Sequence, residues 1–148
     1  MIVRRISALF AAVLLGTVST QASEGWLTRY EEALAAAKQQ DRLILVNFTG
    51  SDWCPPCIKF KNEVLSAEAF QQHAQAGLVL LELDFPRRTQ LPEEQRAHNQ
   101  ELAKRFDVEA FPTVLLLDSE GKVLDRMVGF PRGGLDGFLK FVSRKAAK

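Results

Sequence analysis

Cysteine and histidine are scarce in this chain of 148 residues. The only cysteines are Cys54 and Cys57, and the only histidines are His73 and His98. Zinc and copper sites need more ligands than two thiolates, and both histidines fall on predicted helices far from the cysteines in the sequence. We therefore predict no metal site, and we expect the histidines to face solvent or to cap helices.

Charge of one sign is not in excess either, because the formal net charge is +1. No field of the whole molecule therefore favours nucleic acid or anionic lipid as a partner. The sequence also lacks a G-x-G-x-x-G motif, a P-loop and a Ser-His-Asp pattern, and it has no internal repeat. We expect one globular domain that has no cofactor and binds no nucleic acid.

The N-terminus differs in composition from the rest of the chain. Two arginines precede an uncharged stretch over residues 6–18, and small residues follow up to Ala22. This pattern predicts a secretory signal peptide over residues 1–22, because the stretch is shorter than the roughly 20 residues that span a bilayer. We expect residues 23–148 to be an exported domain without stable membrane insertion after cleavage.

Export would place the two cysteines in an oxidising compartment, where a lone pair normally forms a disulfide. A structural disulfide stabilises a protein chiefly by restricting the unfolded chain, and the effect grows with the length of the closed loop. A bridge between Cys54 and Cys57 closes almost no loop, so it would be a poor staple. The pair is better interpreted as a redox centre.

Apolar residues predict helices and strands that alternate along the chain. Thr28 and Glu31 form a capping-box pattern, and an apolar stripe that includes Trp26 and Tyr30 predicts a first helix over residues 28–40. The other predicted elements are a strand over 43–48, a helix from about Cys54, a helical piece capped by Ser66 and ending at Gly77, a strand over 78–83, a helix over 92–106, strands over 113–117 and 122–128, and a closing helix after Gly134. Alternation indicates parallel strands joined by helices, with an antiparallel hairpin at the end.

The cysteines follow the first buried strand, where the functional groups of a parallel sheet gather. Pro55 and Pro56 fit the first turn of the next helix because its N–H groups have no helical partner. The helix N-terminus favours a thiolate at Cys54, and Cys57 lies one turn onward, at a spacing that a disulfide can bridge. We predict that Cys54 attacks a substrate disulfide and Cys57 resolves the mixed disulfide, while Trp53 shields the pair.

The segment Trp53-Cys54-Pro55-Pro56-Cys57, together with Phe111-Pro112-Thr113 later in the chain, resembles thioredoxin. Over residues 28–146 the pattern is similar to exported thioredoxin-like proteins, in particular the periplasmic C-terminal domain of the transmembrane disulfide reductase of the Dsb system. The resemblance implies an α/β thioredoxin fold with a central mixed sheet of four to five strands flanked by helices. It also implies a cis peptide bond before Pro112, a substrate chain that pairs beside this proline, and a docking groove shaped by Phe111.

One departure from thioredoxin concerns proton transfer. Thioredoxin has a buried aspartate on the strand before the motif, which helps to move the proton of the second cysteine. The matching position here is Asn47, if one inserted residue is allowed, and an amide cannot act as a base. Glu82, Asp52 or a water molecule is left as the proton acceptor.

A second departure is the Pro55-Pro56 pair, which offers neither an N–H nor a side-chain donor to the sulfur of Cys54. The N–H of Cys57, the helix field and the charges of Lys59 or Lys61 remain. We therefore predict a mildly lowered pKa for Cys54 and a fairly reducing couple.

The predicted function is reduction of protein disulfides by the Cys54/Cys57 dithiol, which an upstream thiol donor such as a membrane reductase would regenerate. A dithiol oxidase remains an alternative, as does a redox-regulated binding or chaperone module without turnover. Arg87 and Arg88 lie in a predicted loop over residues 85–92. They are interpreted as solubilising charges, with contact to an acidic partner as the alternative.

Overall fold

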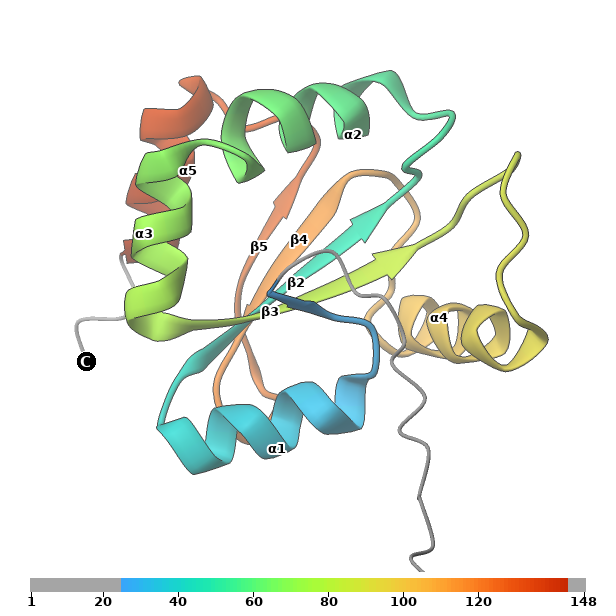
Figure 1. Cartoon of the computed structure of the whole chain (residues 1–148), viewed down its shortest axis with the longest axis horizontal. Coiled ribbons are helices and arrows are strands. Elements are labelled where there is room, and N and C mark those ends of the chain that lie inside the picture. Colours follow the sequence, from blue (N-terminus) through green and yellow to red (C-terminus); the bar gives the residue numbers. More distant parts are fainter. Residues whose placement is uncertain (1–24, 144–148) are drawn as a thin grey trace, which may run out of the picture.

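A five-stranded mixed sheet forms the centre of the protein, with strand order β1-β3-β2-β4-β5. The computed structural model describes residues 25–143, so the predicted signal peptide lies outside the described residues. The strands are β1 (Trp26–Leu27), β2 (Leu43–Thr49), β3 (Leu78–Asp84), β4 (Thr113–Leu117) and β5 (Val123–Val128). Within the described range, the helices are α1 (Tyr30–Gln40), α2 (Pro55–Phe60), the π-helix η1 (Lys61–Leu65), α3 (Glu68–Gly77), α4 (Glu93–Arg105) and α5 (Gly134–Ser143) (Figure 1).

The helices form a layer on each face of the sheet. Helices α2, η1, α3 and α5 cover one face, and α1 and α4 cover the other (Figure 1). Phe138 of α5 packs edge-on against Phe60 of α2, with ring centroids 5.0 Å apart, and also contacts Phe70 of α3. Burial of one such side chain stabilises the fold by roughly 1.5–3 kcal/mol. These three rings therefore hold α2, and the cysteines at its start, against the sheet.

The direction of β4 differs from the prediction. Strands β2 and β3 are parallel, as the alternation indicated, but β4 runs antiparallel to β2 although a helix precedes it. Phe48 pairs with Thr113, and Ile44 pairs with Leu117, so β4 begins beside the end of β2. The reversal places the segment before Thr113 at the same end of the sheet as the cysteines, where β2 ends.

The start of the chain also differs from the prediction. Trp26 is not part of the first helix but forms β1, which pairs in parallel with β3 and turns the indole into the core on the face opposite to Tyr30. The capping box was wrong as well, because α1 begins at Tyr30 and no side chain of Arg29 caps it. The N–H of Tyr30 instead donates to Nε2 of His98 over 3.2 Å. This histidine therefore caps a helix, which is one of the two roles that we expected for it.

The helix that starts at α2 continues without a break into η1, which the sequence did not predict. Its wide turn ends at Ser66, and α3 then begins after Ala67 without a side-chain cap, so the predicted cap by Ser66 was wrong. Such wide turns often occur near functional sites. Among the described helices, none has the length and hydrophobicity that a bilayer crossing requires.

Candidate active site

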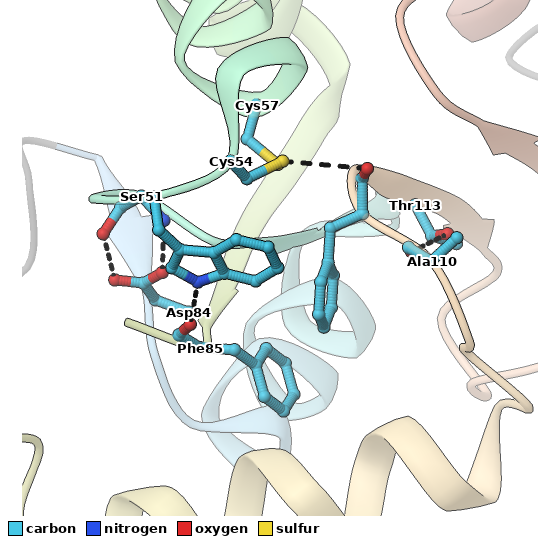
Figure 2. Close-up of a disulfide and its surroundings, with 9 residues drawn as sticks. Ser51, Cys54, Cys57, Asp84, Phe85, Ala110 and Thr113 are labelled. Atoms are coloured by element: carbon cyan, nitrogen blue, oxygen red, sulfur yellow. Dashed lines mark hydrogen bonds between the residues drawn. A yellow bond between two sulfur atoms is a disulfide. The ribbon is translucent and has the colours of Figure 1, made fainter. Parts of the chain in front are cut away.

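Cys54 and Cys57 form a disulfide at the N-terminus of α2 (Figure 2). Their Cα atoms are 5.2 Å apart and the sulfurs 2.09 Å apart. Cys54 has the extended backbone of an N-cap residue, and the following prolines occupy the first helical positions, where they are exposed. The two cysteines are only 4% and 2% exposed, respectively. The pair is thus an oxidised, largely buried centre. Residues next to the cysteines, such as the exposed prolines, form the protein surface around it.

The predicted Phe111-Pro112 segment lies directly against this disulfide. Its peptide bond is cis, and Pro112 is buried. The carbonyl oxygen of Phe111 is 3.7 Å from Sγ of Cys54 (Figure 2). A disulfide sulfur has no proton to donate, so this distance is a contact in the oxidised protein, whereas a Cys54 thiol could donate to the same oxygen. The carbonyl of Pro112 accepts the N–H of Gly129, which ties the segment to the end of β5.

Aromatic side chains lie beside the two cysteines, at the end of the sheet where β2 and β3 finish. Trp53 packs edge-on against Phe111, with centroids 6.1 Å apart, and Phe85 stacks on the same ring at 4.9 Å. The indole N–H of Trp53 donates to the carbonyl oxygen of Phe85 over 2.7 Å, and the Arg87 guanidinium lies 3.5 Å from the centre of the indole ring. Sequence reasoning identified Trp53 and Phe111 but missed Phe85, whose position directly after β3 was the available signal.

The loop between β2 and α2 is tied to the loop after β3 by two carboxylates. Asp52 accepts the backbone N–H groups of Arg87, Arg88 and Thr89 over 2.8–2.9 Å. Asp84 accepts both the N–H and the hydroxyl of Ser51 (Figure 2). The N–H of Arg87 is the main cause of a lowered pKa at Asp52, against a smaller effect of burial. Asp52 therefore holds the loop and, with both oxygens engaged, is a poor proton acceptor.

Asn47 and Glu82 lie side by side on neighbouring strands, as the register of β2 and β3 pairs them. Asn47 is 2% exposed, and its Oδ1 has no hydrogen-bond donor among the described residues. Glu82 is partly buried, and this burial raises its pKa. The positive charge of Lys61 opposes the rise in pKa, whereas Asp84 adds to it.

The groups expected to stabilise a Cys54 thiolate are mostly engaged elsewhere. The N–H of Cys57 donates to the carbonyl oxygen of Cys54 over 3.0 Å, which corrects the expectation that it would be free to face the sulfur. Lys59 lies 3.9 Å from the carboxylate of Glu63 and 4.5 Å from the ring centre of Phe130. In the described part of the chain, no N–H or O–H donates to either sulfur.

A pocket of about 310 Å³ adjoins the aromatic side chains beside the cysteines. It lies between α4 and the loop after β3, and its lining includes Phe85 and Arg87, both of which contact Trp53. Among residues 25–143, no three potential ligands gather at one place where they could hold a metal ion.

Comparisons with known proteins point to one family. The thioredoxin-like domain matches residues 30–142. Disulfide bond reductase DsbH of Chlamydia pneumoniae is 46% identical over 105 residues, which make up 71% of this chain and 63% of that protein. Thiol:disulfide interchange protein DsbD of Actinobacillus pleuropneumoniae serotype 5b (strain L20) is 32% identical over 106 residues, or 70% of this chain and 16% of that protein. The match thus spans less than two thirds of either relative.

A solved structure of the DsbH oxidoreductase superposes on this protein with a TM-score of 0.74. The two are 36% identical, and the superposition covers 90% of this chain and 95% of that chain. The predicted α/β fold with a mixed sheet is confirmed. Since the family match extends over most of the described residues, this chain belongs to the thioredoxin-like domain family, with Cys54 and Cys57 joined as a disulfide at the start of α2.

Proposed function

We propose that this protein reduces disulfide bonds of other proteins in the bacterial periplasm, after removal of residues 1–22 as a signal peptide. The observation that carries the proposal is the Cys54–Cys57 pair at the start of α2, with Sγ of Cys54 against the carbonyl of Phe111. The name of the DsbH relative, a disulfide bond reductase, supports the same activity and direction.

In the proposed reaction, the thiolate of Cys54 attacks one sulfur of the substrate disulfide. The second substrate sulfur leaves as a thiolate and takes a proton from water. Cys57 then loses its proton and attacks Sγ of Cys54, which releases the first substrate sulfur and forms the Cys54–Cys57 disulfide. Two electrons pass from the dithiol to the substrate. An upstream thiol donor, of which a membrane reductase is our candidate, returns the enzyme to the dithiol form.

Weak stabilisation of the Cys54 thiolate supports the reducing direction. A dithiol becomes a strong oxidant when hydrogen bonds and positive charges stabilise its reduced form. Here Pro55 and Pro56 supply no N–H, and the N–H of Cys57 donates to a carbonyl. We therefore expect a reducing couple, with a midpoint below about −200 mV, in contrast to the value of about −120 mV of the strong Dsb oxidant.

The docking surface in this proposal consists of Trp53, Phe111 and Pro112. The rings of Trp53 and Phe111 contact each other and present an apolar rim beside the disulfide. A substrate chain would pair with the backbone next to Pro112 like an added strand, because that backbone precedes β4 and lies against Cys54.

Insulin reduction by the protein and by Cys54→Ser tests whether the chain turns over. We expect turnover by the native protein and none by the variant. Equal rates would favour a binding or chaperone module whose cysteines do no catalysis.

A redox titration of the pair tests the direction, and a midpoint near that of the strong Dsb oxidant would favour the dithiol oxidase. Capture of mixed disulfides with Cys57→Ser would then identify substrates. A protein expressed with its N-terminus intact and recovered from the periplasm without residues 1–22 would support the predicted export.

A further inference from the structure

The resolving step of the proposed function requires a base that can reach a buried thiol. Cys57 is 2% exposed, and removal of a proton from a buried thiol is unfavourable because the thiolate has lost its water. The proton must nevertheless leave Cys57 as its sulfur attacks Cys54. A base for this proton is needed in the proposed function, on which its assignment rests.

Two of the carboxylates near the site are already engaged. Both oxygens of Asp52 accept backbone N–H groups, and these lower its pKa. Both oxygens of Asp84 accept groups of Ser51. Asn47 is an amide and cannot take up the proton. Of the acids that were considered from the sequence, Glu82 alone keeps a carboxylate without a hydrogen-bond donor in the described structure.

The pleat of the sheet places Glu82 on the face that α2 and η1 cover. Side chains alternate along a strand, and Leu45 and Leu80 both belong to the core under α2 and η1. Asn47 lies two residues after Leu45, and Glu82 lies two residues after Leu80, so both point to that same face. The register pairs Asn47 directly with Glu82. The carboxyl group therefore lies next to the buried amide, on the cysteine side of the sheet.

The unpaired Oδ1 of Asn47 is a second, independent observation at this place. A buried acceptor without a donor costs about 1–3 kcal/mol, and native proteins rarely leave one without a purpose. A protonated Glu82, or a water molecule bound between the two side chains, would supply the missing donor. The orphaned oxygen thus marks a position where a proton can be held between β2 and β3.

We propose that Glu82 accepts the proton of Cys57 through one water that Asn47 Oδ1 holds, as Cys57 attacks Cys54. The S–H bond of Cys57 breaks, the Sγ–Sγ bond forms, and the substrate sulfur leaves with the electron pair of the mixed disulfide. Glu82 then passes its proton to solvent beside Lys61. In the reverse reaction, when a donor reduces the disulfide, Glu82 returns the proton to Cys57. Asn47 is a positioning residue in this scheme.

Charge around Glu82 is consistent with such a role. Burial raises its pKa, so it holds a proton more readily than an exposed carboxylate does. Lys61 of η1 lowers this pKa and Asp84 on its own strand raises it. Burial and Asp84 thus favour uptake of a proton by this carboxyl group, and Lys61 favours its release.

Rapid mixing of the reduced protein with a fluorescent disulfide peptide separates two phases, namely formation of the mixed disulfide by Cys54 and its resolution by Cys57. We expect Glu82→Gln to leave the first phase unchanged and to slow the second about 10²-fold at pH 6–7. The two proteins should converge at high pH, where hydroxide removes the proton. Glu101→Gln removes an exposed carboxylate of α4 as a control and should behave as the native protein. Equal resolution rates in Glu82→Gln and the native protein from pH 5 to 9 would overturn the proposal.

A double variant tests the location of the carboxyl group. Asn47→Asp combined with Glu82→Gln returns an acid to the same face, one strand away, and should recover most of the lost rate. A double variant as slow as Glu82→Gln alone would overturn the scheme.

An NMR titration of the native protein provides a third test. The ¹³Cδ resonance of Glu82 should titrate at a different pH in the reduced than in the oxidised protein, because only the reduced form has the Cys57 proton. Identical titration curves would overturn the proposal. Failure of the native protein to form a mixed disulfide in the first phase would instead refute the proposed function, and the inference with it.

Discussion

The carbonyl oxygen of Phe111 lies 3.7 Å from Sγ of Cys54, although the two residues belong to different halves of the chain. The contact exists because β4 runs antiparallel to β2 and begins beside its end. A parallel β4 would have put Phe111 at the opposite end of the strands, beside the start of β2. The orientation of a single strand thus assembles the candidate site.

Replacement of Phe111 by Ala should weaken the action on protein disulfides more than on small ones. The variant loses ring contacts with Trp53 and Phe85, and with them the apolar rim for a substrate chain. We expect kcat/KM for insulin to fall about tenfold, since aromatic pairs contribute about 0.5–1.5 kcal/mol each. The rate with a small aromatic disulfide should change less than twofold. Val128→Ala, an exposed apolar change at the end of β5, is the control. An equal loss with both kinds of substrate would contradict a docking role.

Arg87 and Arg88 offer a matched pair of substitutions. Only Arg87 lies over the indole of Trp53, although the backbone N–H groups of both donate to Asp52. Arg87→Ala should change the fluorescence of Trp53 and lower the free energy of unfolding by about 0.5–1 kcal/mol, while Arg88→Ala should do neither. Emission spectra and urea unfolding measure both effects. Indistinguishable variants would mean that the stacked guanidinium contributes nothing in solution.

Loss of the Asp52 carboxylate should change stability at low pH in a defined direction. The N–H groups that it accepts lower its pKa in the folded protein, led by that of Arg87. Its contribution is therefore present above the unfolded pKa of about 3.9 and is lost as the pH falls through the folded value. Asp52→Asn should be less stable than the native protein at pH 7, and the difference should shrink on acidification. Thermal unfolding from pH 2 to 7 checks this, with Glu101→Gln as an exposed control.

Glu82 should show the opposite dependence. Burial raises its folded pKa, so the folded state holds the proton more tightly than the unfolded state does. The charged carboxylate therefore costs nothing below the unfolded pKa of about 4.3, and its cost grows as the pH rises toward the folded pKa. Glu82→Gln should match the native protein in stability near pH 4 and exceed it at pH 8. A variant less stable than the native protein at both pH values would argue that the carboxylate is stabilised in the fold.

Much of the fold could be predicted from local patterns. The strand over 43–48, the helix that begins after Cys54 and the closing helix after Gly134 lie close to where periodicity and turn residues placed them. β1 was missed because two residues cannot show a period. The direction of β4 was missed because alternation alone does not fix how a helical connection returns to the sheet.

The candidate site was predictable where a motif carries it and unpredictable where long-range contacts do. Cys54, Cys57 and the Phe111-Pro112 segment were found from short patterns. The contacts of Asp52 with the loop after β3, and of His98 with Tyr30, join residues more than thirty positions apart. No periodicity or spacing encodes such pairs. The choice between Asp52 and Glu82 as a proton acceptor could therefore be made only once the partners of each carboxylate were known.

Hydrogen bonds join the loop of Ser51 and Asp52 to the loop after β3. They limit how this site could be grafted into another protein. A designer who grafted residues 53–57 into another scaffold would move the cysteines without the segment that holds Trp53 in place. The indole would lose its acceptor at Phe85, and Asp52, which ties the loop to three backbone N–H groups, would be left behind. Residues 50–57 and 84–89 must therefore be moved together, and the Phe111-Pro112 segment must be moved with them.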